Sequence, residues 1–503
     1  MTLEEWLTLK NGTDVRGVAL EGVPDEPVNL TEEVVEKIAK AFCVWLSQRT
    51  GKIDLTIAVG HDSRLSAPQM MRYVARGITA SGFHMIDTGL SSTPSMFMLL
   101  KDESFQADAS IEITASHLPF NKNGLKFFVK EGGLEGGDIT EILKIAHGGA
   151  FLSGNGSVRK ESYMDKYSAD LVAMVRKATG EEQPLFGKKI VVDAGNGAGG
   201  FYVDKVLKPL GADTEGSQFL EPDGSFPNHI PNPENKAAMQ SVCRAVKDAG
   251  ADFGIIFDTD VDRAGAVDSK GEEINRNRLI ALISAILLSE RPGSTIVTDS
   301  VTSDGLARFI RAKGGVHHRF KRGYKNVINE SKRLNEQGVY SPLAIETSGH
   351  AALRENYFLD DGAYLVTRIL ISLAKQAKEG KDVLSLIADL PEPKEAAEIR
   401  LRFPVGSDFK KLGAEIIANL EEECKHRSDV TLSPDNYEGI RMNFGKENGD
   451  GWILVRMSLH EPIMPINMES NSQGGVKKLA AVLYGMLSRY EYLDPARLLD
   501  PRE

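Results

Sequence analysis

Three stretches of the chain share one pattern of hydrophobic and polar positions: an apolar run, a polar turn and a helix-like segment. They are LTIAVGHDSR (55–64), KKIVVDAGNGAG (188–199) and STIVTDSVTSDG (294–305). This pattern is typical of a buried parallel strand that leads through a turn into a helix. The strands begin roughly a hundred or more residues apart, a spacing typical of domains. We therefore predict three similar α/β domains.

Changes in composition indicate where these domains end. The segments GGAFLSGNGS (148–157), DSKGEEIN (268–275) and PEPKEAAE (391–398) are rich in turn-forming or charged residues. Beyond the last of them, strand-like runs at 399–404 and 452–459 indicate a smaller C-terminal α+β domain. The predicted domains are 1–155, 156–270, 271–392 and 393–503, with limits good to about ten residues.

Bulk composition narrows the classes of function. With 503 residues, 41% hydrophobic and 26% charged, the chain is an ordinary globular protein, too long for one core. A net charge of −11 argues against a general nucleic-acid binder. Three widely spaced cysteines, no signal-peptide pattern at the start and an apolar run (279–288) too short for a membrane span predict a cytoplasmic protein without membrane partners.

An acidic triplet follows one apolar run. After FGIIF come Asp258, Asp260 and Asp262, at alternate positions. Such carboxylates converge if the chain curls at a strand end, where open α/β sheets bind ligands, and hard oxygen donors suit Mg²⁺. A Ca²⁺-binding EF-hand is excluded because Arg263 and Ser269 stand where that loop needs Gly and Glu. A solvated acidic turn is the remaining alternative, which the preceding buried strand disfavours.

A second candidate segment is IEITASHLPFNKNGLKFF (111–128). Ser116 lies in a predicted loop between extended segments, with His117 and Lys126 near enough in sequence to balance negative charge. Lys126 could carry protons if its pKa were lowered. The alternative is a plain turn with a capping serine. A serine hydrolase is disfavoured, because the sequence has no G-x-S-x-G elbow and no acid spaced to orient His117.

Four separated motifs resemble those of the α-D-phosphohexomutase superfamily, the phosphoglucomutases and phosphomannomutases. They are TASHLP (114–119), DTDVDR (258–263), ETSGH (346–350) and RMSLHEP (456–462), similar to the family's phosphoserine, metal, sugar and phosphate loops. Lesser matches are DVRG (14–17), GHDSRLS (60–66) and the basic loop KRG (321–323). The resemblance covers essentially the whole chain. It implies three similar α/β domains with mixed sheets and a smaller C-terminal α+β domain, arranged around a central cleft.

The resemblance also implies a role for individual residues. Ser116 would be phosphorylated and would bind one Mg²⁺ together with Asp258, Asp260 and Asp262. Lys126 would be the general acid/base. The remaining implied site residues are, for catalysis, His117 and Arg16 and, for substrate binding, Arg263, Lys321, Arg322, Gly323, Glu346, Ser348, His350, Arg456, Ser458 and His460.

The implied reaction interconverts hexose 1-phosphate and hexose 6-phosphate, of glucose, mannose or both. Phospho-Ser116 would pass its phosphoryl group to the substrate, and a hexose 1,6-bisphosphate would be the intermediate and activator. Three alternatives stay open: a phosphoglucosamine mutase, a weakly active sugar-phosphate-binding protein and a Mg²⁺-dependent phosphatase. The sequence leaves monomer and dimer equally open.

Four positions depart from the family pattern. Leu118 replaces Asn, Thr259 replaces Gly, His460 replaces Thr, and Pro465 stands where an additional arginine is common. Loss of that arginine removes a bidentate phosphate contact. The departures bear on substrate identity more than on chemistry, because the serine and all three aspartates are present.

Overall fold

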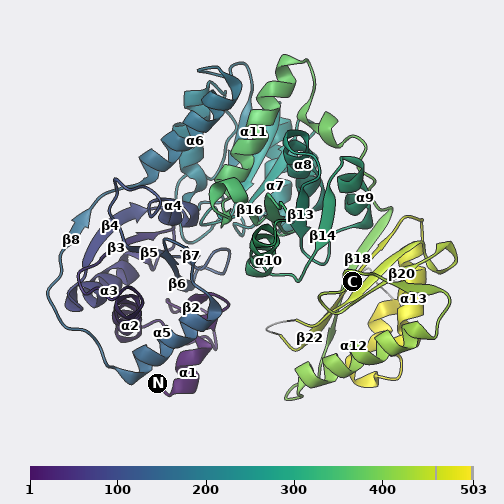
Figure 1. Cartoon of the computed structure of the whole chain (residues 1–503), viewed down its shortest axis with the longest axis horizontal. Coiled ribbons are helices and arrows are strands. Elements are labelled where there is room, and N and C mark those ends of the chain that lie inside the picture. Colours follow the sequence, from purple (N-terminus) through teal and green to yellow (C-terminus); the bar gives the residue numbers. More distant parts are fainter. Residues whose placement is uncertain (459–460, 500–503) are drawn as a thin grey trace. The chain divides into compact units, whose positions relative to one another are not determined.

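The computed structural model describes residues 1–458 and 461–499, and internal contacts divide the chain into two units. Unit one contains residues 1–275 and 348–385, and unit two contains residues 276–347 and the chain from residue 386 on. Figure 1 colours both along the sequence.

Unit one begins with a mixed sheet. Its strands are β1 (Lys10–Asn11), β2 (Asp14–Val18), β3 (Thr56–His61), β4 (His84–Leu90), β5 (Ala109–Ile113), β6 (Lys122–Val129), β7 (Gly132–Gly133) and β8 (Val158–Lys160). Their order is β1-β2-β6-β5-β3-β4-β8, with β7 beside β6. Strands β5, β3, β4 and β8 run parallel, whereas β2, β6 and β5 pair antiparallel. The run at 55–64 thus forms the central parallel strand that its pattern predicts.

Helices cover both faces of this sheet. They are α1 (Leu3–Thr8), α2 (Glu32–Thr50), α3 (Ala67–Ala80), α4 (Thr93–Met98) and α5 (Gly136–Gly148). One core joins α2, α3 and α5 to the sheet, and Figure 1 shows these helices on the same face, opposite α4. Helix α2 is capped at its N-terminus by the Thr31 hydroxyl, which accepts a hydrogen bond from the Val34 amide. Gly51, whose φ is 71°, caps its C-terminus.

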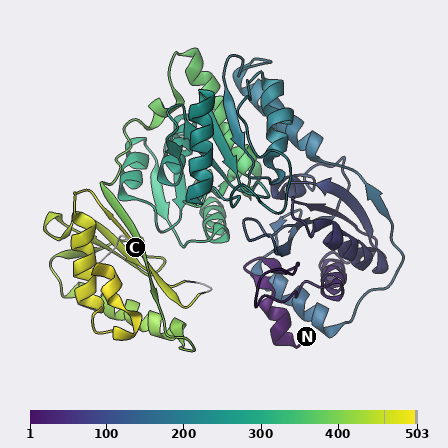
Figure 2. The same cartoon turned by 180° about the vertical axis from the view of Figure 1, so that it is seen from behind.

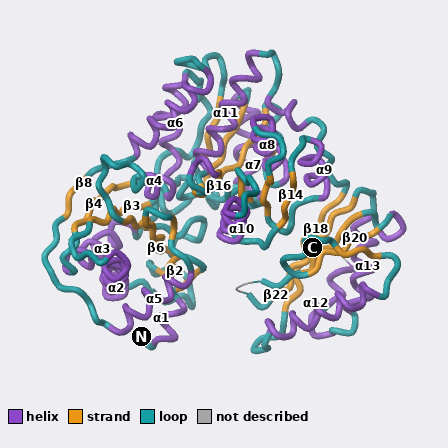
Figure 3. The backbone as a smooth tube through the Cα atoms, viewed as in Figure 1, coloured by secondary structure: helices purple, strands orange, loops and turns teal. Residues whose placement is uncertain are grey.

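A second mixed sheet completes unit one. Its strands, in the order β12-β11-β10-β9, are β9 (Ile190–Asp193), β10 (Phe253–Phe257), β11 (Ala264–Asp268) and β12 (Glu273–Ile274). Only the pair β9–β10 is parallel. Its helices are α6 (Met164–Thr179) and α7 (Lys236–Ala249), with short turns η1 (Ala198–Gly200), η2 (Val203–Leu207) and η3 (Lys208–Leu210). Figure 3 distinguishes helices, strands and loops along the chain.

The later segment of unit one packs against this second sheet. It contains β16 (Ala351–Leu353), η4 (Arg354–Asn356), β17 (Leu359–Asp360) and α11 (Gly362–Lys378). Helix α11 packs against α6 and β11. The backbone N–H of Gly362, at the start of α11, donates to the carbonyl of Val261 at 3.0 Å, so this helix also supports the acidic loop.

Unit two combines an α/β part with an antiparallel sheet. The first part contains α8 (Asn277–Glu290), β13 (Thr295–Thr298), α9 (Asp304–Ala312), β14 (Val316–Arg319), α10 (Tyr324–Glu336) and β15 (Leu343–Ile345), and β13 is parallel to both β14 and β15. Helix α8 is buried from Leu279 to Leu288. Over the range that the structure describes, no helix is long and apolar enough to cross a bilayer.

The antiparallel sheet of unit two has the order β18-β22-β21-β20-β19. Its strands are β18 (Glu395–Arg402), β19 (Val430–Leu432), β20 (Ile440–Phe444), β21 (Gly451–Val455) and β22 (Ile463–Ser470). Helices α12 (Phe409–Lys425) and α13 (Gly475–Leu487) share one hydrophobic core with it and cover the same face (Figure 2). Short turns are η5 (Val383–Ile387), η6 (Lys446–Asn448), η7 (Glu491–Leu493) and η8 (Pro495–Leu499).

A buried arginine joins the two parts of unit two. Arg441, on β20, donates to the Ser300 carbonyl at 3.0 Å and to Asp304 Oδ1 at 2.9 Å. Its guanidinium also stacks 3.6 Å from the Trp452 ring centre. Because Arg319 donates to the same Asp304 carboxylate at 2.7 Å, the acidic charge has two cationic partners.

The close packing of α2 on α3 gives a stability prediction. A Cβ atom at Gly77 would lie 2.6 Å from both the Ala39 side chain and the Glu36 carbonyl. We expect Gly77→Val to lower the free energy of unfolding by about 2 kcal/mol or more through overpacking, measured by thermal and urea denaturation. Gly137→Ala in α5 is the control, because no atom of the described residues would lie within 4 Å of a Cβ at that position. Equal stability of the Gly77→Val variant and the parent would contradict the prediction.

Candidate active site

Ser116 lies in a buried loop between β5 and β6. It is 4% exposed, and its φ of 52° places it in the left-handed region, which costs a non-glycine residue about 1–3 kcal/mol. The Ser116 amide donates to Thr114 Oγ1 at 2.8 Å, and Thr114 Oγ1 donates to Asp62 Oδ2 at 2.7 Å. The loop conformation is therefore held by buried hydrogen bonds.

Arg64 holds the same loop through the loop's backbone carbonyls. It is 1% exposed, and its guanidinium donates to the carbonyls of Ser116, of Leu118 at 2.6 Å, and of Pro119 and Lys122 at 2.8 Å each. Its counter-charge is Asp62, 3.4 Å away. Sequence reasoning did not assign Arg64 to the site, although the GHDSRLS match was a usable signal. Because Leu118 contributes its backbone carbonyl, the departure at this position leaves the contact intact.

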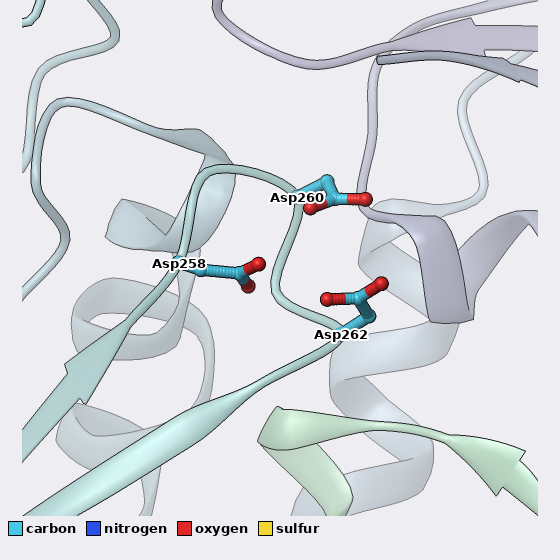
Figure 4. Close-up of side chains that lie close together, drawn as sticks. All are labelled: Asp258, Asp260 and Asp262. Carbon is cyan, nitrogen blue, oxygen red and sulfur yellow. The ribbon is translucent and has the colours of Figure 1, made fainter. Parts of the chain in front are cut away.

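The acidic triplet forms the connection between β10 and β11. Asp258, Asp260 and Asp262 are all buried, and ligand oxygens from the three carboxylates lie within 4.8 Å of one another (Figure 4). Val261, between the last two, has a φ of 65°, unusual for a β-branched residue. The chain therefore curls at the strand end, as the metal-site interpretation requires.

The acidic loop reaches the serine directly. Ser116 Oγ lies 3.1 Å from Asp258 Oδ2. Arg263 donates from Nε to Asp258 Oδ2 at 3.0 Å and from Nη2 to Ser116 Oγ at 3.0 Å. Side chains 142 positions apart in sequence thus meet at one hydroxyl.

The triplet is suited to a hard divalent cation. Asp260 Oδ1 and Asp262 Oδ1 are buried and accept no hydrogen bond from the residues that the structure describes. Buried carboxylate oxygens without donors need a cationic partner. Oxygen donors of this kind, clustered near a hydroxyl that can be phosphorylated, match the ligand preference of Mg²⁺.

Lys126 already neutralises part of this acidic charge. Its Nζ lies 2.7 Å from Asp260 Oδ2 and 2.6 Å from Asp262 Oδ2, and Thr93 Oγ1 donates to Asp260 Oδ2 at 2.5 Å. Burial alone would lower the pKa of Lys126, but the two carboxylates outweigh it and raise that pKa well above the usual value. The lowered pKa that the sequence interpretation required is therefore not found in this arrangement.

His117 is a hydrogen-bonding neighbour of Ser116. His117 Nδ1 lies 3.3 Å from Ser116 Oγ and accepts a hydrogen bond from Arg263 Nη2 at 2.5 Å. Burial, followed by the charges of Arg263 and Arg16, lowers the pKa of His117 to about 2. His117 is thus neutral at physiological pH, so it serves as a hydrogen-bonding group here and does not supply the positive charge that the sequence suggested.

Three further predicted residues lie in unit one. Arg16, on β2 opposite Gly124, pairs with Asp14 at 2.8 Å. Ser348 Oγ and His350 Nδ1 are 2.8 Å apart, and His350 Nε2 lies 3.9 Å from Asp262 Oδ1. Burial lowers the pKa of His350 to about 3 despite that acid. Unit one therefore contains the serine, the acids, Lys126, Arg263 and these flanking groups.

Sequence reasoning also missed a buried acid near Lys126. Glu112 on β5 stands opposite Lys126 on β6, and Ser91 Oγ donates to its Oε2 at 2.8 Å. Burial raises the pKa of Glu112 well above its usual value. A carboxyl group within an apolar strand was the only available signal, and the alternation pattern alone does not show which cation it faces.

The remaining predicted residues belong to unit two. Lys321, Arg322 and Gly323 lie between β14 and α10, and the Gly323 amide donates to Glu346 Oε1 at 2.6 Å. Arg456 and Ser458 follow β21, and His460 lies outside the described residues. A cavity of about 420 Å³ is lined by Lys321, Arg322, Glu438 and Met457 among others.

Two further departures have a visible structural setting. Thr259 is fully buried, and its carbonyl accepts a hydrogen bond from the Ala198 amide at 2.7 Å. Pro465 lies on β22, and its carbonyl accepts from the Arg456 amide at 3.2 Å. Pro465 thus orients the Arg456 backbone although it has no side-chain donor for a phosphate.

Family models describe most of the chain. The phosphoglucomutase/phosphomannomutase α/β/α domains I, II and III match residues 8–151, 161–271 and 275–393. The chain belongs to the phosphoglucomutase/phosphomannomutase family. It is therefore a phosphohexomutase, an enzyme of the isomerase class, which confirms the resemblance and the predicted fold class.

Individual relatives agree with this assignment. A phosphoglucomutase of Neisseria meningitidis serogroup B is 30% identical, over 93% of this chain and 94% of the relative. A phosphomannomutase/phosphoglucomutase of Pseudomonas syringae is 29% identical, over 96% and 95%. The crystal structure of a family protein from Burkholderia thailandensis matches with a TM-score of 0.80 and 27% identity, covering 98% of each chain. These relatives favour the glucose and mannose interpretation of the phosphohexomutase over the amino-sugar alternative.

The Arg64 contacts generate a prediction for this phosphohexomutase. Arg64→Lys keeps the charge but cannot reach all four carbonyls, so we expect the free energy of unfolding to fall by about 2–4 kcal/mol. Denaturant unfolding, with circular dichroism as the signal, measures the change. The control is Arg72→Lys on the exposed face of α3, expected to shift stability by less than about 0.5 kcal/mol. Equal effects of the two substitutions would refute the role of Arg64 in holding the loop.

Proposed function

We propose that this phosphohexomutase interconverts hexose 1-phosphates and hexose 6-phosphates of glucose, mannose or both, with Ser116 as the phosphoryl carrier. The observation that carries the proposal is the position of Ser116 Oγ, 3.1 Å from Asp258 Oδ2 and 3.0 Å from Arg263 Nη2. A phosphoryl group on this oxygen would have a guanidinium on one side and the acidic triplet on the other. Positioning and charge compensation are the main requirements of phosphoryl transfer.

In the proposed reaction, the Oγ–P bond of phospho-Ser116 breaks as a sugar hydroxyl forms a new O–P bond. The proton of that hydroxyl is transferred to Ser116 Oγ. In the second transfer, the other sugar O–P bond of the bound hexose 1,6-bisphosphate breaks as the Oγ–P bond forms again, and the proton of Ser116 Oγ passes to the freed sugar oxygen. Arg263 compensates charge on the transferring group throughout, because its guanidinium already contacts Ser116 Oγ at 3.0 Å.

Lys126 is the proposed general acid/base. Because Asp260 and Asp262 raise its pKa, the ammonium form is the resting form, which is the form that donates a proton. A cation sharing these carboxylates would weaken their hold on Lys126 and move its pKa downward. The Arg16 guanidinium and the neutral His117 imidazole would hold the phosphate oxygens.

Mg²⁺ is the proposed metal, held by Asp258, Asp260, Asp262 and an oxygen on Ser116. When bound, it would draw charge from the transferring phosphoryl group. The support is the chemistry of the donor set and the two buried aspartate oxygens without donors among the described side chains.

Sugar recognition is proposed for the residues that the family resemblance implies. The sugar hydroxyls would contact Glu346, Ser348 and His350, and the phosphate would contact Lys321, Arg322, Gly323, Arg456, Ser458 and His460. Glu346 already accepts a hydrogen bond from the Gly323 amide, so the acid and the basic loop are oriented together. Hexose 1,6-bisphosphate is the proposed activator.

The proposal extends to domain limits and location. We propose functional domains at 1–155, 156–270, 271–392 and 393–503, supported by family matches that end at 151, 271 and 393. A cytoplasmic location is supported by three free cysteines, of which Cys43 and Cys424 are buried.

The carrier role is tested with Ser116→Ala. We expect the purified parent to carry the mass of one phosphoryl group at Ser116, and the variant to lose mutase turnover by at least about 10³-fold, because no other oxygen occupies this position. Intact-mass spectrometry and a coupled assay with glucose, mannose and glucosamine 1-phosphates, plus trace bisphosphate, measure both. Full turnover by the alanine variant would sink the assignment, and release of free phosphate without isomer would indicate a phosphatase.

The metal site is tested by direct binding. We expect Asp260→Asn to weaken Mg²⁺ binding by about tenfold or more, because a buried carboxylate ligand loses its charge. Calorimetric titration of protein that carries no phosphoryl group on Ser116 measures the Mg²⁺ affinity without any turnover. Asp268→Asn, an acid further along β11, is the control and should bind Mg²⁺ as the parent does. Unchanged affinity in Asp260→Asn would place the metal elsewhere.

A further inference from the structure

A carboxylate lines the cavity of unit two beside Lys321 and Arg322. Glu438, in the turn before β20, accepts hydrogen bonds at Oε2 from Ser300 Oγ at 2.6 Å and from the Arg322 amide at 3.0 Å. Its Oε1 lies 3.9 Å from Arg456 Nη1. Three segments, which follow β13, precede α10 and follow β21, therefore converge on one side chain.

The groups that surround Glu438 are those that proteins use for phosphate. A hydroxyl, a backbone N–H and a guanidinium are all donors, and two of them belong to residues proposed above to contact the substrate phosphate. The same side chain lines the cavity of about 420 Å³ beside Lys321 and Arg322. This volume falls within the range of small-molecule pockets, about 300–1,000 Å³.

Because the contact between Glu438 and Arg456 is largely buried, solvent screens it only weakly. The side chains of Glu438 and Arg456 are 13% and 11% exposed. Burial lowers the pKa of Arg456, and the charge of Glu438 acts in the opposite direction. An anion that binds the same donors would meet a like charge at short range, where solvent screening is small.

We propose that Glu438 is an internal anion that the substrate phosphate must displace, so that it sets the affinity of unit two for phosphate. The inference rests on the proposed function in taking that phosphate as part of a sugar phosphate. A phosphate dianion has the charge and the oxygens to replace a single carboxylate on these donors. The measured binding free energy is then the difference between the interaction of phosphate with these donors and the interaction of the Glu438 carboxylate with them. This competition lowers the affinity for phosphate, which favours release of product after each turnover.

Glu438→Gln tests the proposal, because it keeps the size and an acceptor oxygen but removes the charge. We expect the dissociation constant for inorganic phosphate to fall about tenfold, given one like charge removed at this range. Calorimetry on the full-length protein measures this dissociation constant. Arg456→Ala is combined with the parent and with Glu438→Gln, and only the phosphate binding that this substitution abolishes is attributed to the donors around Glu438. The KM for glucose 1-phosphate should fall in parallel.

Matched variants separate the charge from other effects. Glu421→Gln alters another acid that lines the same cavity, on α12, and should leave phosphate affinity within about twofold of the parent. Glu438→Ala removes the charge together with the whole carboxylate and leaves Ser300 Oγ as a donor, so phosphate should again bind about tenfold more tightly. If Glu438→Gln fails to fold, Glu438→Ala still decides the question.

Weaker or unchanged phosphate binding in Glu438→Gln would overturn the proposal, because Glu438 would then orient the donors without competing for them. Unchanged or weaker binding in Glu438→Ala would count against it in the same way. Phosphate affinity is measured without turnover, so a parent protein that fails to isomerise sugar phosphates would refute the proposed function alone.

Discussion

The compensation of buried acidic charge is the constraint on which unit one depends. Asp258, Asp260 and Asp262 are buried beside Ser116, where an uncompensated carboxylate is very costly. Arg263 pairs with the first acid and Lys126 with the other two. These cations also face the serine oxygen or its neighbours, so the contacts that make the acids tolerable arrange the groups needed for phosphoryl transfer.

The loops that contain Ser116 and the acidic triplet follow strands of the two sheets, and hydrogen bonds keep these loops in strained conformations. Ser116 and Val261 both have positive φ and lie in connections that follow β5 and β10. Arg64 holds the serine loop through backbone carbonyls, and the amide of Gly362 holds the Val261 carbonyl. A Cβ at Gly362 would lie 2.6 Å from the Arg263 backbone, which explains the absence of a side chain at the start of α11. Strain of this kind persists only where surrounding structure determines it.

Buried charge is also compensated in unit two, where the buried groups are cations and hydrogen-bond donors and the partner is an acid. Arg456 and the N–H groups of the 321–323 loop form a concentration of donors, and Glu438 satisfies part of it. Elsewhere in that unit, Arg441 is buried only because Asp304, the Ser300 carbonyl and the Trp452 ring surround it. Departures from the family pattern at Leu118 and Pro465 are accommodated because both positions contribute backbone carbonyls, which any residue possesses.

The sequence alone determined the elements and the chemistry available to them. Apolar runs before polar turns located β3, β9 and β13, and the motif order identified the family, since strand patterns and short loops are local properties. Only the tertiary structure decided which charges face one another: the pairing of Lys126 with two aspartates, the neutrality of His117, and the roles of Arg64, Glu112 and Glu438. The physical reason is that pKa values and ion pairs depend on burial and on distances between residues far apart in the chain, neither of which a local pattern encodes.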